Sequence, residues 1–520
     1  MWWRRLSAAV CGCVILQIVG AAAVPHERFE PVAPVEYDGV RNANHIFNAI
    51  HSSMRQWGSS LNHNGMSLFL AQVPAGTQFY HGTGTPDPVS GMEWLAFEPE
   101  HALNFARMAR RHDKSLDQIP GDFSLQSIEQ SQVSIAGDDG HQPPTRPVPL
   151  PGWLHTYRTK ETIPLLYIDG MSAGKCDKGT MDTQDVLLLN ATGGYRDIFW
   201  EKERAEGLCK LARDTWDGKI KGFIRTEAGF EVILCSFSEN LEFVRAVRTG
   251  PFTPKGLEPN PDEPLDRHIW DWLKFITARY DGIGGGRVKL DYDDFITCFS
   301  YDLDLFRTDD GLPRLMNLSI ASLDIVRNDI TTMVTQWDSS TGPKGGKIDW
   351  QSVADMIIQR YANDLKFIVS DTLTTSEQLF SELRLLLRGF VDSDARNVAI
   401  EINRCTAQFI PVDTDAPESL SLAGRAIYSV AKRVCSTLFD VFDANLSLSE
   451  SREKLRALMK YLGWTVWRKC PECPLNKVCF IPIWPFGSVE DREHPQCRNF
   501  TEIQGRRGYW GDFQRRPPRS

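Results

Sequence analysis

The first 24 residues restrict the chain most, because they have the features of a secretory signal peptide. Arg4 and Arg5 give a positively charged start, an apolar stretch runs from Leu6 to Val24, and a run of alanines ends at Ala23. A charged start, an apolar centre and small residues near the cleavage point are typical of a signal that is removed from the mature protein. The apolar stretch nears membrane-spanning length, so an uncleaved signal anchor is the alternative. The sequence predicts a secreted, extracellular protein with no further membrane span.

The cysteines and glycosylation sequences agree with secretion. Of the 12 cysteines, Cys11 and Cys13 leave with the signal and ten remain. An even number of cysteines in an oxidising compartment predicts up to five disulfides. Asn-x-Ser/Thr sequences are acceptors for N-glycosylation, so we expect a glycoprotein. They occur at Asn190, Asn317, Asn445 and Asn499.

The balance of charges excludes one class of function. The chain has 58 Lys and Arg against 67 Asp and Glu, a net charge of −9 at pH 7. A net-acidic chain has no bulk charge with which to bind nucleic acid, so we expect no nucleic-acid partner. With 520 residues, of which 42% are hydrophobic, the chain is long enough for several domains that each bury a core.

The order of apolar patterns predicts an α+β protein. After the signal, residues 25–250 alternate between strand and helix patterns, with a polar insert rich in Pro and Gly at 113–152. A Pro-rich boundary then begins a mainly helical domain at 251–465. Residues 466–520 form a Cys-rich C-terminal segment with a basic tail.

The four cysteines of that last segment raise the question of zinc. Cys470 and Cys473 are two residues apart, and Cys479 and Cys497 follow at irregular spacing. Four thiolates can bind zinc tetrahedrally. The irregular spacing and the oxidising compartment favour disulfides, so no metal is expected.

Three short strings in the first domain contain residues suited to chemistry. In the first, Phe79 to Thr83, His81 ends an apolar strand and Gly82 permits a tight turn. The second, Trp94 to Ala106, reads as a strand that enters a helix. In the third, Gly229 to Cys235, the Glu231 carboxylate opens an otherwise apolar strand.

This order resembles the ADP-ribosyltransferase fold, in the clade whose first core strand ends in His-Gly-Thr. The resemblance covers roughly residues 66–240 and implies a split mixed β-sheet core. It implies that His81 holds the adenosine ribose of NAD. It also implies that Glu231 hydrogen-bonds the nicotinamide ribose and stabilises the positive charge that develops as nicotinamide leaves.

The remaining residues of the implied NAD site surround these two. Gly82 and Thr83 follow His81 in the same motif, and Trp94 or Tyr157 could stack on the nicotinamide ring. The family's usual Ser-Thr after the second strand is replaced by Phe97-Glu98-Pro99, and its middle Tyr is matched by both Tyr157 and Tyr167. Such a site uses NAD and no metal.

The whole chain also resembles a family of secreted fungal proteins of unknown function. Three strings carry this likeness, Phe199 to Glu206, Ala228 to Cys235 and Arg279 to Arg287. The likeness implies a fungal source and an extracellular place, and no reaction.

The sequence therefore supports three hypotheses of function. The first is a secreted NAD-dependent ADP-ribosyltransferase, or an NAD glycohydrolase that uses water as the acceptor. The second is a non-catalytic secreted protein that keeps the same fold for binding or structure. The third is a secreted glycan-active hydrolase with two carboxylates in an open groove. The first requires His81 and Glu231 to face one cleft.

Two other patterns favour plain structural interpretations. The glycines from Gly282 to Gly286 lack the spacing of a phosphate loop, and a strand pattern follows them where a helix should begin, so a tight turn is expected. The acidic residues between Asp291 and Asp304 lack a calcium-loop pattern and predict a solvated face. No serine-hydrolase elbow and no His-Glu-x-x-His sequence occurs.

Overall fold

In the computed structural model the secondary structure is described in seven segments: residues 39–108, 150–191, 200–250, 265–339, 348–410, 417–444 and 446–511. The predicted signal peptide at 1–24 lies outside the described residues, as do most of the insert at 113–152 and the end of the basic tail. By their contacts, the described residues belong to one compact unit, Val35–Ser520.

A nine-stranded mixed sheet forms the centre of the described chain, in the order β10-β6-β2-β3-β9-β8-β7-β1-β11. The neighbouring strands are antiparallel except β7 and β8, which are parallel. The strands are β1 (Asn64–Val73), β2 (Gln78–Thr83), β3 (Glu93–Ala96), β6 (Trp153–Thr159), β7 (Ile163–Gly170), β8 (Gly222–Thr226), β9 (Phe230–Leu234), β10 (Leu241–Arg248) and β11 (Lys289–Thr297). The prediction of an α+β protein with a mixed sheet is confirmed.

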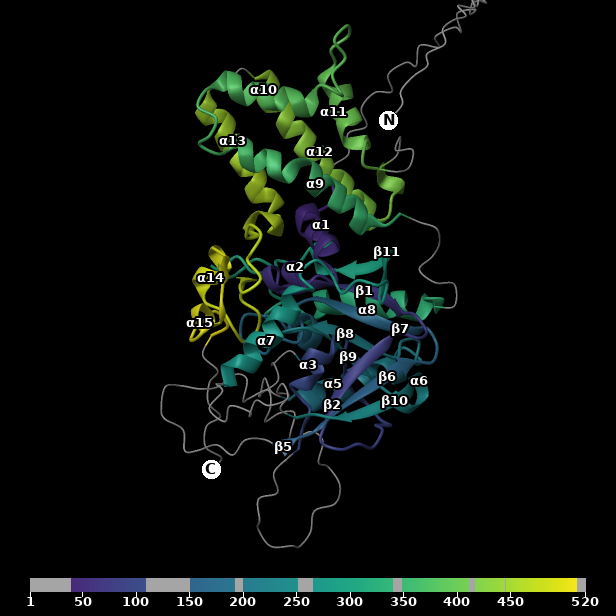
Figure 1. Cartoon of the computed structure of the whole chain (residues 1–520). Helices are drawn as coiled ribbons and strands as arrows, with labels where there is room; N and C mark the ends of the chain where they lie inside the picture. Colours follow the sequence, from purple (N-terminus) through teal and green to yellow (C-terminus); the bar gives the residue numbers. More distant parts are fainter. Residues whose placement is uncertain are drawn as a thin grey trace, which may run out of the picture. The chain divides into compact units, whose positions relative to one another are not determined.

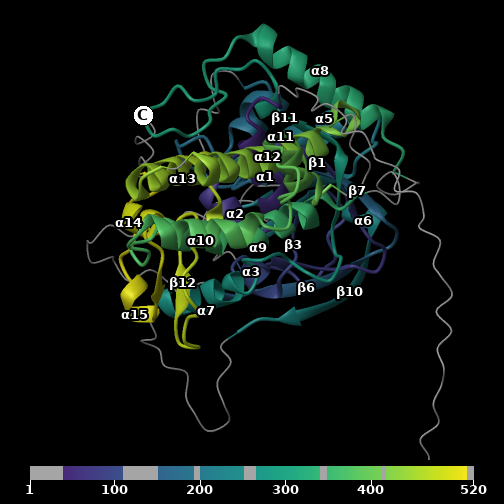
Figure 2. The same cartoon turned by 90° about the horizontal axis from the view of Figure 1, so that it is seen from above.

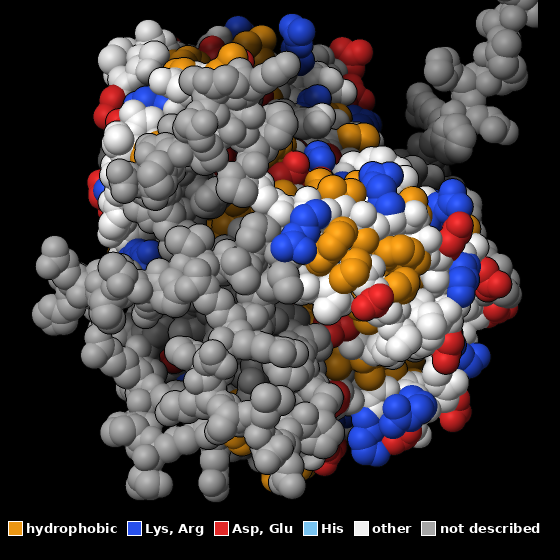
Figure 3. Space-filling view, turned by 60° about the horizontal axis from the view of Figure 1, so that its bottom comes forward, with side chains coloured by type: hydrophobic (Ala, Val, Ile, Leu, Met, Phe, Trp, Pro, Cys, Tyr) orange, Lys and Arg blue, Asp and Glu red, His pale blue; other side chains and the backbone are white. Residues whose placement is uncertain are grey.

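The middle of the sheet is buried on both faces. All ten residues of β1 are buried, and β8 and β9 are buried along their whole length. Strands covered on both sides read as nearly continuous apolar runs, as in Leu68–Ala71 at the centre of β1 and in β9 apart from Glu231. At one edge, β10 exposes Val244 and Val247. The space-filling view shows hydrophobic side chains beside Lys and Arg on one face of the molecule (Figure 3).

The sheet takes strands from both sides of residue 250. Strand β11, which lies beyond the Pro-rich boundary, pairs with β1 through Phe295 opposite Phe69. The two rings stack with their centroids 4.8 Å apart. The boundaries at 250 and 465 stay predictions, but the second predicted domain contributes one edge of this sheet.

The second half is mainly helical, as predicted. Helices α9 (Trp350–Ile368), α10 (Ser376–Leu387), α11 (Val398–Ala407), α12 (Leu422–Asp443) and α13 (Leu448–Leu462) form a group in which α12 contacts the other four. Helix α1 (Ala43–Ser52) packs on both this group and the sheet, as Figures 1 and 2 show. Apolar residues of the sheet and of these helices therefore share one core.

Local sequence signals set the helix starts. Thr375 and Gln378 form a capping box at the start of α10, and Ser447 and Glu450 form another at α13. In each box the two side chains satisfy backbone N–H groups that the first helical turn leaves without partners. The glycine run 282–286 forms the expected turn, with positive φ at Gly284, Gly285 and Gly286.

Four disulfides occur among the described residues, and they confirm the disulfide prediction. Cys470–Cys479 and Cys473–Cys497 join the C-terminal segment, where β12 (Val478–Phe480) pairs with β13 (Gln496–Arg498). Cys209–Cys235 lies within the first predicted domain and Cys405–Cys435 within the mainly helical one. Cys176 and Cys298 are buried free thiols. The four C-terminal thiols are thus used in disulfides.

Two further expectations concern surfaces. None of the helices in the described segments combines the length and apolar character needed to cross a membrane. Among the described residues, no three of the acidic side chains between Asp291 and Asp304 converge to within metal-binding distance. Asp291 is buried, contrary to the expected solvated face, and it accepts hydrogen bonds from the backbone N–H groups of Asp293 and Asp294.

Candidate active site

The strands that contain His81 and Glu231 are separated by one strand only. Strand β3 lies between β2 and β9 in the sheet. Tyr80 is paired with Ala96, and Ala96 is paired with Glu231. The predicted site residues are therefore near one another along the sheet, and the remaining question is which face each side chain occupies.

His81 and Glu231 lie on opposite faces of the sheet. Residues directly opposite each other in antiparallel strands point to the same face, so Tyr80, Ala96 and Glu231 share one face. Successive residues of a strand alternate between faces, which turns His81 to the other side.

Two contacts agree with this assignment. A Cβ added at Gly82 would lie 2.1 Å from the Ala102 carbonyl oxygen, so helix α3 (Pro99–Leu103) covers the face of Tyr80, Gly82 and Glu231. The His81 ring packs instead on His155 and Phe237, at centroid distances of 6.1 and 5.6 Å. The side chains of His81 and Glu231 therefore project from opposite faces of the sheet, although both residues border one small cavity.

On its own face, His81 belongs to a closed aromatic cluster. Its Nδ1 is hydrogen-bonded to the Trp94 carbonyl oxygen at 2.8 Å. Burial lowers the pKa of His81 to about 4, so the ring is neutral at neutral pH. Tyr157 lies on the same face, its ring against Phe237, and its hydroxyl oxygen accepts a hydrogen bond from the Val89 N–H. The protein's own side chains fill this side of the sheet.

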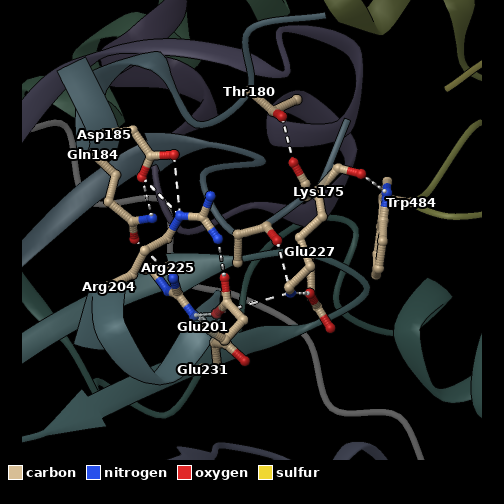
Figure 4. Close-up of polar contacts among 12 residues, drawn as sticks. Lys175, Thr180, Gln184, Asp185, Glu201, Arg204, Arg225, Glu227, Glu231 and Trp484 are labelled. Atoms are coloured by element: carbon tan, nitrogen blue, oxygen red, sulfur yellow. Dashed lines mark hydrogen bonds and ion pairs between the residues drawn. The ribbon is translucent and has the colours of Figure 1, made fainter. Parts of the chain in front are cut away.

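On the opposite face, Glu231 is part of a buried ion-pair cluster, which Figure 4 shows. Arg225 is paired with Glu231 across the β8–β9 hairpin, and its Nε and Nη2 donate to Glu231 Oε1 at 3.1 and 2.5 Å. Arg225 also donates to Glu201 Oε2 and Gln184 Oε1, each at 2.7 Å. Although burial opposes its charge, the carboxylates of Glu201 and Glu231 raise the pKa of Arg225.

The cluster continues beyond Arg225. Lys175 Nζ donates to Glu227 Oε2 at 2.7 Å and lies 3.9 Å from Glu201 Oε2. Burial raises the pKa of Glu227 to about 7, whereas the charges of Arg225, Lys175 and Arg204 overcome burial and lower the pKa of Glu201 to about 2. Arg204 Nε also bonds both carboxylate oxygens of Asp185. Helix α5 (Glu201–Asp214) supplies Glu201 and Arg204.

A small cavity borders Glu231. Gly82, Trp94, His101 and Glu231 line it, and its volume is about 30 Å³. His81 also borders the cavity, but its ring is directed at the aromatic cluster. One water molecule needs about 10–15 Å³ of such space, so the cavity has room for two or three waters and none for a dinucleotide. A second cavity of about 20 Å³ lies on another side of His101, next to Gly229 and Trp272.

The predicted site residues are thus divided by the sheet. Gly82, Trp94 and Glu231 border the cavity under α3, while His81 and Tyr157 face the aromatic cluster; Thr83 follows in the same strand and pairs with Trp153. The predicted site residues do not include the cations Lys175, Arg204 and Arg225. Arg225 had a signal that could have been used, because a charged residue inside the apolar string Gly222 to Thr226 needs a buried partner.

Part of the chain matches a known protein-family model. Residues 32–253 match the family model of the YPL277C N-terminal domain. The match spans both strands of the His81 and Glu231 pair and ends near the predicted boundary at 250.

Two relatives from Saccharomyces cerevisiae extend the similarity. The chain is 25% identical to "Uncharacterized protein YOR389W" over an alignment that covers 94% of each chain. It is 34% identical to "Uncharacterized protein YPL277C", over 49% of this chain and 55% of that relative. No solved structure matches the chain. The comparisons support a relationship to a family of uncharacterised fungal proteins, as the sequence indicated, and the likeness to ADP-ribosyltransferases stays a prediction.

Proposed function

We propose that this chain is a secreted protein that acts by binding, on a scaffold whose resemblance to ADP-ribosyltransferases does not extend to NAD chemistry. This is the second of the three hypotheses drawn from the sequence. The observation that carries it is the placement of His81 and Glu231 on opposite faces of the sheet.

The surroundings of Glu231 support the same proposal. Stabilising the charge that develops as nicotinamide leaves requires an ionised carboxylate directed at that charge. Here Glu231 Oε1 already receives two hydrogen bonds from Arg225, so much of its charge is balanced within the protein. The neighbouring cavity, at about 30 Å³, would have to open widely to admit a nucleotide.

A glycan-active hydrolase is less well supported. Glycosidases place their two carboxyl groups about 5–10 Å apart on either side of an open substrate groove. One buried pair in the cluster, Glu227 and Glu231, has oxygens within 4.8 Å of each other, and both side chains are enclosed by the protein. A sugar chain could not pass between them without unpacking α3.

Binding would use the surface of the helical half. A groove of about 500 Å³ runs between α9 and α10, lined by apolar and charged side chains. Met356 and Leu385 remain 46% and 53% exposed there, which is high for large apolar residues. Apolar surface with a polar surround is typical of protein-binding sites.

Secretion is part of this proposal and has separate support. Four disulfides form within the described residues, and such bonds persist in oxidising compartments. The acceptor residues Asn190 and Asn317 are exposed, which glycosylation requires. Asn445 lies outside the described residues, and Asn499 caps the short helix α15 (Phe500–Ile503).

Calorimetric titration of the secreted full-length protein with NAD tests the proposal. We expect no saturable heat up to millimolar NAD. His81→Asn serves as a matched control, because it alters the residue that the family likeness assigns to the adenosine ribose. Saturable NAD binding by the wild type, weakened by His81→Asn, would overturn the proposal and restore the first hypothesis.

A further inference from the structure

Three buried ligand groups converge at the end of the β8–β9 hairpin. One ring nitrogen of His101 and one carboxylate oxygen each of Glu227 and Glu231 lie within 4.8 Å of one another. The three residues are 4%, 3% and 4% exposed. His101 comes from α3, Glu227 lies in the turn between β8 and β9 and Glu231 lies in β9, so two separate parts of the chain form the group.

The turn is built to hold the His101 ring close. Gly229 has a φ of 148°, a conformation that residues with a side chain rarely adopt. A Cβ at this position would lie 2.9 Å from His101 Nδ1. A larger residue would therefore push the imidazole out of its place beside the glutamates.

His101 has unused binding capacity. Neither ring nitrogen has a hydrogen-bond partner of good geometry, although the Ala228 backbone lies near enough to favour protonation slightly. Burial lowers the pKa of His101, although the nearby charge of Glu231 acts to raise it. Buried polar groups are nearly always hydrogen-bonded, so an exception of this kind calls for an explanation.

The glutamates also have capacity beyond their ion pairs. Lys175 bonds Oε2 of Glu227, and Arg225 bonds Oε1 of Glu231, so each carboxylate has a second oxygen that these bonds do not use. Lys175 additionally donates to the Ala173 carbonyl oxygen at 3.1 Å and lies over the Trp484 ring. Lys175 therefore keeps these two partners if the Glu227 carboxylate turns toward another cation.

Among the described residues, the charge of this cluster is one positive charge short of neutral. Three cations face four carboxylates when all are ionised. The cations are Lys175, Arg204 and Arg225, and the carboxylates are Asp185, Glu201, Glu227 and Glu231. A divalent ion with one bound hydroxide, whose proton has passed to solvent, would make the cluster neutral.

We propose that His101, Glu227 and Glu231 form a binding site for a divalent transition-metal ion of the zinc class. One imidazole and two carboxylates are a ligand set that zinc accepts, with a water molecule as the fourth ligand. The cavity beside Glu231 has space for that water. Ligand atoms around a tetrahedral zinc ion lie ~3.4 Å apart. The three ligand atoms must therefore move about 1 Å closer to one another when the ion binds. The site goes beyond the proposed binding function and departs from the expectation that no metal is used.

Metal analysis of the secreted full-length protein tests this proposal. The protein is purified without a metal-affinity step under non-reducing conditions, equilibrated with Zn²⁺, dialysed and analysed for bound metal. We expect one zinc per chain in the wild type and in His155→Asn. The latter is a matched control, because His155 is also buried but bonds to Thr85 and Tyr157 on the other face of the sheet. In His101→Asn we expect roughly tenfold weaker binding or more.

A second variant and a spectrum make the test decisive. Glu227→Gln keeps the size of the side chain and should also lose zinc, so it serves if His101→Asn does not fold. Cobalt bound to the wild type should show visible absorption of a four-coordinate ion without a thiolate charge-transfer band. A metal-free wild type, an unchanged stoichiometry in both variants, or a thiolate band from Cys176 or Cys298 would overturn the proposal.

Discussion

Arg225 lies directly opposite Glu231 in the β8–β9 hairpin and bonds its Oε1 through two nitrogens. This pairing gives Glu231 a structural partner inside the protein. The carboxylate that the family resemblance assigns to NAD is therefore one member of a cluster that also includes Glu201, Lys175 and Glu227. Several consequences of this arrangement can be measured.

Replacing Arg225 with Met should destabilise the protein strongly. The change removes the cation that balances Glu201 and Glu231 and leaves buried carboxylates without compensation. Loss of one partner of a buried ion pair costs roughly 3–5 kcal/mol in the free energy of unfolding. Urea denaturation of the variant measures this cost.

The matched control is Arg158→Met, because Arg158 pairs with Glu242 at the surface, where both side chains are about half exposed. Exposed pairs contribute about 0–1 kcal/mol. If both variants lose the same free energy of unfolding, the cluster does not stabilise the fold in the way described.

Gly229→Ala should lower the free energy of unfolding by about 1–3 kcal/mol. The added methyl group meets a backbone with φ of 148° and lies 2.9 Å from the His101 ring. Gly91→Ala, where an added Cβ meets nothing within 4 Å, should be nearly neutral. Thermal and urea unfolding measure the two stabilities. Equal stability of the two variants would show that the backbone at Gly229 is not strained by a side chain.

Asp169 should make stability depend on pH. Burial raises its pKa from 3.8 to about 7 in the folded protein. Because the folded value is the higher one, its contribution to stability is fully present below about pH 4 and is lost as the pH rises to about 7. With 1.36 kcal/mol for each pKa unit, the upper limit of this loss is about 4 kcal/mol.

Asp169→Asn isolates this contribution, because the amide oxygen can still accept the Ser67 N–H hydrogen bond. As the pH rises from 4.5 to 8, the free energy of unfolding of the wild type should fall relative to that of the variant. A difference that stays constant over this range would show that Asp169 is ionised in the folded protein.

The number of free thiols tests secretion and the disulfides together. If the signal peptide is removed with Cys11 and Cys13, the unfolded, unreduced protein should have two thiols, Cys176 and Cys298. Titration with a thiol reagent in guanidinium chloride measures this number. Four thiols would indicate either a retained N-terminus or one disulfide that does not form, which N-terminal sequencing distinguishes, and more than four would contradict the disulfide pairs.

Much of the fold could be predicted from the sequence, because it depends on local patterns. The apolar runs of β7 and β9 and the helical spacing of Leu379 and Leu383 in α10 are visible in the residues themselves. The choice of disulfides over zinc for Cys470 and Cys473 followed from the spacing and the inferred compartment.

The face of each site residue could not be predicted in the same way. A shift of one residue in a strand's register moves every side chain to the other face. In β2, Phe79 and Tyr80 are both large and aromatic, so the alternation that would reveal the faces is missing around His81. The ion-pair cluster depends on contacts between distant residues, such as Lys175 and Glu227, which are 52 positions apart.

The most direct measurement is nicotinamide release from NAD by the purified secreted protein, beside Glu231→Gln. The variant keeps the shape of the side chain and removes its charge, and circular dichroism confirms that both proteins are folded. We expect no release above the rate in buffer from either protein. Release by the wild type that is lost in Glu231→Gln would contradict this expectation and would assign Glu231 to catalysis.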